Sequence, residues 1–260
     1  MTFSKAELED LGRAKRLLET PGIAMRLSSF AGAPVEKGLR LLPSPAQKAI
    51  HAITQAALNF ALSIAVRSLG DAPGKKSSDQ MHKVTAAMSG AIGGAFGLGG
   101  LALELPVSTA LILRSVADIA SSEGENPRHL ETRIECLTVF GLGSPEDRRD
   151  DAAESAYFAA RTALAGAVTE ATKHLAQKGL AKSGGPAIVR LISLITARFG
   201  IVVSEKAAAQ LVPVIGAAGG ALVNTIFIGH YQDMARGHFI VRRLEKIHGE
   251  ETVREAYDKL

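Results

Sequence analysis

The feature that most constrains this chain is a run of small apolar residues at 84–103, VTAAMSGAIGGAFGLGGLAL, which contains no charged side chain. Gly93 and Gly97 lie four residues apart in this run. That spacing leaves one face of a helix bare, so that a second helix can contact its backbone. Each such glycine costs a helix in water about 1 kcal/mol relative to alanine. Close packing or an apolar solvent must offset that cost.

A second charge-free run, at 211–229, repeats the pattern with Gly216 and Gly220. The composition agrees, since the chain has 26 glycines and no tryptophan, and 47% of its residues are hydrophobic. No segment alternates apolar and polar residues as a half-buried strand would. We therefore predict an all-α fold, a single multi-helix bundle with two glycine-rich apolar helical regions in its core.

The pattern divides the chain into an N-terminal amphipathic helix and connector at 1–45 and a helical domain at 46–260. In the first part, Leu11 and Leu18 belong to an apolar set that recurs at helical spacing among lysines and arginines. Such a helix can lie on an anionic membrane or pack on the body of the protein, and packing is the favoured interpretation. After the first glycine-rich run, Pro106 is expected to begin the next helix, because a missing N–H is tolerated in a first turn.

The chain holds one cysteine, Cys136, so it cannot form an internal disulfide. Carboxylates flank Cys136 as much as arginine does, which does not favour a reactive thiolate. We interpret Cys136 as a buried structural residue, and a single cysteine is typical of a reducing compartment. The first twenty residues are charged throughout and lack the apolar stretch of an export signal. These observations predict a cytoplasmic location.

Charge is distributed unevenly along the chain, whose formal net charge is +4. The segment 123–154 is acidic, and the parts on either side of it are mildly basic. The acidic middle interrupts any continuous basic stripe, and no aromatic residues alternate with cations, so no nucleic-acid partner is expected. The pattern fits an oriented molecule that binds a surface. The acidic segment itself is expected to be exposed.

The sequence lacks the common motifs of catalysis. It contains no P-loop, HExxH, CxxC or GxSxG pattern, so we predict no catalytic residue, no metal and no cofactor. The best metal candidate is the set His129, Glu131 and Glu135, but charge-rich segments of this kind are usually solvated surface. A hydrolase that uses Glu104 or the acidic segment is the least supported function.

Four polar side chains stand within otherwise apolar segments: Glu104, Arg114, Asp118 and Asn224. Arg114 and Asp118 share a helix face, and Glu104 could reach a basic group across a helix pair. One interpretation is a structural polar network that fixes the register of the helices, and the other is an anchor for a lipid head group at the mouth of an apolar cleft. The candidate residues for lipid or partner binding are these four together with Gly93, Gly97, Gly216 and Gly220.

Three pieces follow one another in a specific order: LELPVSTALILRSVADIASSEGENP at 103–127, ECLTVFGLG at 135–143 and LVPVIGAAGGALVNTIFIGHYQDMARGHFIVRRLE at 211–245. With the glycine-rich run before them, they resemble the EcsC protein family over 46–244. The family takes its name from a protein encoded beside an ABC transporter. The resemblance implies no defined reaction and supplies no catalytic residue. The positions that fit the shared pattern are Glu104, Pro106, Arg114, Pro213, Gly216 and Asn224.

Together these patterns predict a non-enzymatic protein that binds a lipid or apolar ligand in a glycine-lined interior, or that docks peripherally on the inner membrane. In this interpretation the basic amphipathic ends face anionic lipid. The alternative is a protein-interaction module that regulates a membrane transporter and accepts a partner helix in glycine-lined grooves.

Three charge-free stretches raise the question of a membrane span. Residues 49–66 are long enough, but His51, Gln55 and Asn59 would be costly against lipid, so a half-buried soluble helix is favoured there. The two glycine-rich runs also have the required length. Because each lies beside or contains a polar residue that lipid would disfavour, a soluble bundle is expected for them as well.

Overall fold

The computed structural model describes residues 3–19, 22–31, 35–40, 42–69, 97–144, 155–178, 185–211 and 220–260. Helices α1 to α4 are Lys5–Leu18, Ile23–Ala31, Val35–Arg40 and Ser44–Ser68. The middle of the chain forms α6 (Gly97–Ser122), α7 (Leu130–Thr138) and the 3-10 helix η1 (Val139–Gly141). The remaining helices are α8 (Ala156–Lys178), α9 (Pro186–Leu211), α11 (Gly220–His248) and α12 (Glu250–Asp258). No strand occurs within the described ranges, so the predicted all-α fold is confirmed.

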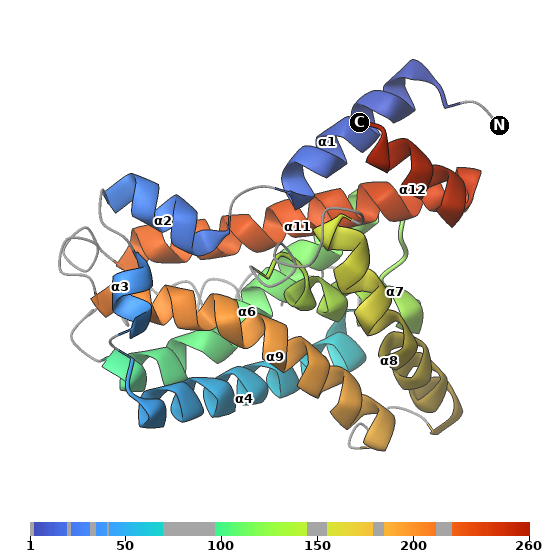
Figure 1. The fold of residues 1–260 in the computed structure, drawn as a ribbon. Coiled ribbons are helices and arrows are strands. Elements are labelled where there is room, and N and C mark those ends of the chain that lie inside the picture. The colour runs from blue at the N-terminus through green and yellow to red at the C-terminus, as the bar shows by residue number, and fades with distance from the viewer. Residues whose placement is uncertain are drawn as a thin grey trace, which may run out of the picture.

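Helix α11 has 29 residues and runs along the whole bundle (Figure 1). Helices α1 and α12 lie against one end of it, and α2 lies against the other. On the other side of the molecule, α4 packs against both α6 and α9. Helix α9 runs opposite in direction to α6 and α11, so its last turns lie beside their first turns (Figure 1).

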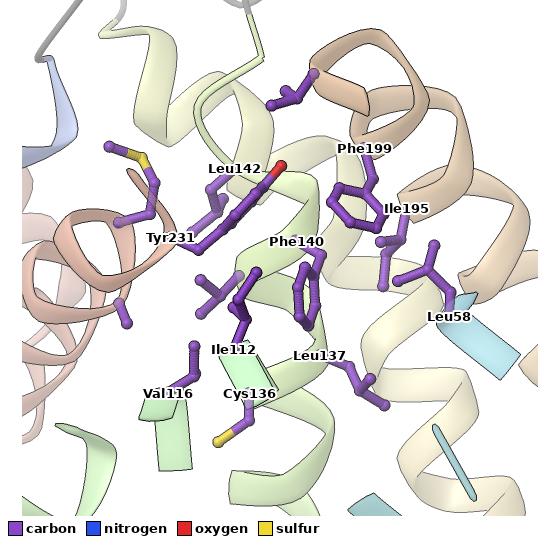
Figure 2. Packing of buried hydrophobic residues seen from close by; sticks show 14 of the residues in the cluster. Leu58, Ile112, Val116, Cys136, Leu137, Phe140, Leu142, Ile195, Phe199 and Tyr231 are labelled. Atoms are coloured by element: carbon purple, nitrogen blue, oxygen red, sulfur yellow. The ribbon is translucent and has the colours of Figure 1, made fainter. Parts of the chain in front are cut away.

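The centre of the core is aromatic and is completed by a segment that we expected at the surface. The rings of Phe140, Phe199 and Tyr231 lie 5.1 to 5.5 Å apart by their centroids (Figure 2). Phe140 belongs to η1, and Ile134 and Cys136 of the preceding α7 are also fully buried. The predicted exposure of the acidic segment is therefore wrong for residues 132–144, because apolar side chains lie between its carboxylates and fill the bundle.

Pro106 does not begin a helix, contrary to our prediction. Helix α6 already begins at Gly97, and Pro106 lies inside it. An interior proline leaves the carbonyl of the fourth residue before it without a helix hydrogen bond. That residue, Ala102, is exposed, so water can bind its carbonyl and reduce the cost.

The N-terminal helix packs on the body of the protein, which is the favoured alternative of the sequence analysis. Leu11 and Leu18 of α1 are buried against α11. At the contact, a Cβ built on Gly237 of α11 would lie 2.5 Å from Leu18 Cγ and 3.1 Å from the Ala14 carbonyl oxygen. The absence of a side chain at Gly237 is therefore what lets the two helices approach so closely.

Helix α4 has the half-buried character that its sequence predicts. His51 and Asn59 are exposed, and Gln55 is partly exposed. Thr54, in contrast, is buried, and its hydroxyl donates to the Ile50 carbonyl at 2.7 Å. His51, Gln55 and Asn59 thus reach solvent in this fold, whereas Thr54 is buried and bonds to its own helix.

Candidate functional site

Lys206 connects three helices at the end of the bundle where α9 finishes. Its Nζ donates to Glu104 Oε1 of α6 at 2.6 Å and to Asn224 Oδ1 of α11 at 2.8 Å. The ammonium also lies 4.4 Å from the centre of the Phe227 ring, within the range of a cation–π contact. The side chain of Lys206 is 0% exposed, whereas that of Glu104 is 19% exposed. We call Glu104, Lys206 and Asn224 the lysine site.

The two glycine-rich runs lead into this site from different parts of the chain. Helix α6 begins at Gly97 and places Glu104 two turns later, and α11 begins at Gly220 and places Asn224 one turn later. The predicted contact of Glu104 with a basic group across a helix pair is confirmed. Two glycines of the predicted set, Gly93 and Gly216, lie outside the described residues.

Burial and charge act in opposite directions on Lys206. Burial lowers its pKa below the ordinary value, and the nearby Glu104 carboxylate raises it. The orientation of the Asn224 amide follows from the same contact, because an ammonium can only donate and must therefore face the amide oxygen. One carboxylate oxygen, Glu104 Oε2, and the Asn224 amide nitrogen remain without a hydrogen bond within the described part of the chain.

Glu205, the residue before Lys206, is buried on a different side of α9. Its carboxylate accepts a hydrogen bond of 3.2 Å from the backbone N–H of Ala24, in the first turn of α2. An anion at that position is favoured by the dipole of the helix. Sequence analysis missed both residues, although Glu205 and Lys206 interrupt an apolar stretch as Glu104 does. The same criterion applied to 201–216 would have found them.

Arg114 and Asp118 do not join the lysine site. They lie further along α6, where Arg114 is partly exposed and Asp118 is exposed, and they do not form an ion pair with each other. Leu103, which is 75% exposed, and the partly exposed Val107 precede them on the same outward face. The prediction therefore combined two separate features, a buried polar site and an outward helix face that changes from apolar to charged.

A second polar network lies at the other end of α11, around His238. The Tyr157 hydroxyl lies 2.9 Å from His238 Nδ1, and Glu135 Oε2 lies 3.2 Å from His238 Nε2. Burial alone would raise the pKa of Glu135, but His238 and the Arg242 guanidinium lower it to about 2. An ionised carboxylate only accepts, so Nε2 carries the ring proton, and Nδ1 accepts from the tyrosine. The network is closed and buried.

The basic residues near the end of α11 bind the acidic segment. Arg242 pairs with Glu125, Glu131 and Glu135 at 3.1 to 3.3 Å. Lys246 also pairs with Glu125, at 2.7 Å. Within the described residues, carboxylates of the acidic segment are therefore paired with the basic end of α11. Two carboxylates of the suggested metal set are among those bound to Arg242, and no metal-binding group of three or more residues occurs within the described ranges.

Cys136 is buried, as predicted. Burial raises the pKa of its thiol well above the ordinary value, and the neighbouring Glu135 carboxylate adds to the effect. A thiol with a raised pKa is a poor nucleophile at neutral pH. The structural role assigned to Cys136 from the sequence agrees with this environment.

Three helices of the described chain are long and apolar enough to cross a membrane, by length and composition: Ser44–Arg67, Gly100–Ser122 and Pro186–Gln210. These segments make up most of α4, α6 and α9. In each of them, 44% of the residues in the most apolar 18-residue stretch are buried. More than half of the residues in each of these apolar stretches are therefore at least partly exposed.

Comparison with known proteins gives one result. The EcsC protein family matches residues 5–244, which cover all of the lysine site and all of α1 as well. No curated protein and no solved structure matches the chain.

Proposed function

The chain belongs to the EcsC protein family, and from that premise we propose that it is a non-enzymatic protein that associates with a membrane or lipid through the outward face of α6, beside the lysine site. The proposal places the protein in the cytoplasm, at the inner surface of the membrane. Its mechanism is partition of apolar side chains into lipid, with no bond made or broken.

The observation that carries this proposal is the incomplete burial of three helices of membrane-spanning length and composition. A soluble bundle normally turns the apolar side of such helices inward. Here less than half of each apolar stretch is buried, so part of its surface remains available to contact lipid.

The outward faces of the three helices are not equivalent. Helix α4 presents polar groups at His51 and Asn59, which would be costly against lipid. Helix α9 presents Arg190 and Ser193, both exposed. On these two helices the exposed apolar side chains, Phe60 and Val189, thus stand beside exposed polar groups.

The outward face of α6 has the opposite character over its first half. Leu103 is 75% exposed, and Val107 and Leu111 follow at helical spacing as partly exposed side chains. At a rise of 1.5 Å per residue, the three span roughly 12 Å. Arg114 and Asp118 then end the apolar face, so polar groups bound it on both sides, as expected for a helix that lies parallel to the membrane surface at the level of the head groups.

Vesicle flotation tests the proposal with a matched pair of variants. The wild-type chain should float with vesicles of phosphatidylcholine, with or without phosphatidylglycerol, because apolar partition carries the binding. Leu103→Asp should abolish flotation by placing a charge in the lipid-facing position. Ile247→Asp is the control, since Ile247 is 52% exposed on the last turn of α11, at the far end of the bundle. Equal flotation of both variants would rule out the α6 face.

A wild-type chain that stays in the soluble fraction with every vesicle, and from which no lipid can be extracted, would overturn the proposal itself. Recovery of the chain only together with a membrane protein, from detergent-solubilised membranes, would point instead to the transporter-regulating module.

A further inference from the structure

We propose that the lysine site recognises the primary ammonium and the phosphate of an ethanolamine phospholipid in a bilayer, through Glu104 Oε2 and the Asn224 amide nitrogen. This inference rests on the proposed membrane association and adds the class of head group. It depends on how Lys206 divides the hydrogen-bonding atoms of its two partners.

Lys206 donates to one oxygen of each partner, and one further polar atom of each partner remains available to a ligand. It binds Glu104 Oε1 and Asn224 Oδ1, at 2.6 and 2.8 Å. The atoms that remain are an anionic acceptor, Glu104 Oε2, and a donor, the Asn224 amide nitrogen. Both side chains are partly exposed, whereas Lys206 is buried and is saturated by its two oxygens and the Phe227 ring. The cation of the site thus orients the other two groups and is not itself offered to a ligand.

The charged acceptor, Glu104 Oε2, and the neutral donor, the Asn224 amide nitrogen, together match one class of head group. A primary ammonium donates hydrogen bonds to a carboxylate, and a phosphate oxygen accepts from an amide N–H. Phosphoethanolamine carries these two groups on one short chain. A purely anionic head group would meet the carboxylate of Glu104 instead of a free cation, so it fits less well. A choline head group keeps the positive charge but has no N–H to donate.

The surroundings of the site favour a lipid over a soluble ligand. Leu103, the residue next to Glu104, is 75% exposed and begins the apolar face of α6. A phospholipid whose head group is bound at Glu104 could therefore place its acyl chains along Val107 and Leu111, which no polar group interrupts on that face. A head group alone would leave this surface in water.

Flotation with vesicles that differ only in the head group tests the inference. Phosphatidylethanolamine and phosphatidylcholine differ by three methyl groups on nitrogen, so the comparison isolates the N–H donors. We expect the wild-type chain to bind vesicles that contain phosphatidylethanolamine about fivefold more tightly than pure phosphatidylcholine, the effect of one or two partly exposed polar contacts. Binding to phosphatidylglycerol should not exceed binding to phosphatidylcholine.

Two variants address the two contacts separately. Glu104→Gln should abolish the preference for ethanolamine while flotation through the apolar face persists. Because this change also removes a partner of Lys206, Asn224→Asp is the second variant. It keeps an oxygen for Lys206 but replaces the amide donor by an acceptor. The amide contacts the phosphate only of a head group whose ammonium is held at Glu104, so loss of this donor should reduce the preference without loss of the fold, which circular dichroism checks. Glu170→Gln, in an exposed ion pair on α8, is the matched control and should behave as wild type.

The head group in solution removes the effect of phosphatidylethanolamine on bilayer packing. Glycerophosphoethanolamine should shift the amide NMR signals of Asn224 and Glu104, and glycerophosphocholine should not. Equal binding to ethanolamine and choline vesicles, or stronger binding to phosphatidylglycerol, would refute the head-group assignment and leave the membrane proposal standing. Failure to bind any vesicle would refute both.

Discussion

Lys206 Nζ and Glu104 Oε1 lie 2.6 Å apart, yet the lysine side chain is 0% exposed and the glutamate side chain is 19% exposed. The two charges are therefore not equivalent. If the lysine is removed, water can still reach the carboxylate. If the carboxylate is removed, the ammonium stays buried with the Asn224 oxygen and an aromatic ring as its remaining partners.

This asymmetry predicts unequal effects of two substitutions on the free energy of unfolding. Glu104→Gln should lower it by about 3 kcal/mol, because a buried cation loses its counter-charge. Lys206→Met, which replaces the cation by an apolar chain of similar length, should lower it by only about 1 kcal/mol. Urea denaturation of both variants measures the difference.

The double variant provides the control for that prediction. Glu104→Gln combined with Lys206→Met should be less destabilised than the sum of the two single variants, because the buried cation is then absent. Strict additivity of the two effects would show that the contact contributes nothing to stability.

The lysine site was predictable in part, and the reason is local. A charge or an amide within an apolar stretch must find a partner, which is why Glu104 and Asn224 could be selected from the sequence alone. That both side chains contact Lys206 could not be predicted, because this contact depends on how α9 lies against α6 and α11. Arg114 satisfied the same criterion and yet lies on the outward face, since a helical position near an apolar stretch does not by itself specify the side that is buried.

The errors in the fold have a similar origin. The carboxylates of 123–154 suggested an exposed segment, but Glu125 and Glu135 bind Arg242 of α11, more than 100 residues away. The composition of a segment cannot predict ion pairs with residues so far away in the sequence. The burial of Cys136 was predictable, because its own neighbours already argue against a reactive thiol.

Two glycines of α11 predict opposite responses to alanine. A Cβ on Gly237 would lie 2.5 Å from Leu18 Cγ, so Gly237→Ala should push α1 away and lower the free energy of unfolding by about 2 kcal/mol. A Cβ on Gly229 meets nothing within 4 Å. Gly229→Ala should therefore raise stability by up to about 1 kcal/mol through helix propensity.

Thermal unfolding of the two glycine variants measures both effects against the same helix. If Gly237→Ala proved as stable as Gly229→Ala, the close contact between α1 and α11 would not exist in solution.

The buried thiol predicts a simple chemical result. Cys136 should not react with a disulfide reagent such as DTNB in the folded protein at neutral pH, because burial raises its pKa and excludes the reagent. In guanidinium chloride one thiol per chain should react. Cys136→Ala gives the background. Rapid labelling of the native protein would mean that α7 leaves the core readily, contrary to the packing around Phe140.

The His238 network predicts how stability depends on pH. The folded Glu135 carboxyl has a pKa of about 2, against an ordinary value of 4.5. Between these values the unfolded chain binds a proton that the folded chain does not, so the contribution of Glu135 is complete above pH 4.5 and is lost as the pH falls toward 2. A shift of this size corresponds to about 3 kcal/mol.

His238 acts in the same direction at higher pH. Burial lowers its pKa from the ordinary value of 6.5, although Glu135 partly opposes the change. The unfolded imidazole therefore takes up a proton first, and the contribution of the neutral ring is present above pH 6.5 and declines below it. Stability measured by urea denaturation should thus fall first below pH 6.5 and again below 4.5.

Substitution separates this network from the other carboxylates, which also titrate in acid. Glu135→Gln should remove most of the dependence between pH 4.5 and 2, because the variant has no carboxyl at that position to protonate. Glu170→Gln, in the exposed pair with Arg190, should leave the profile unchanged. If the difference between wild type and Glu135→Gln stayed constant from pH 7 to 3, the pKa of Glu135 could not be lowered in the fold, and its contact with His238 and Arg242 would not stabilise the carboxylate.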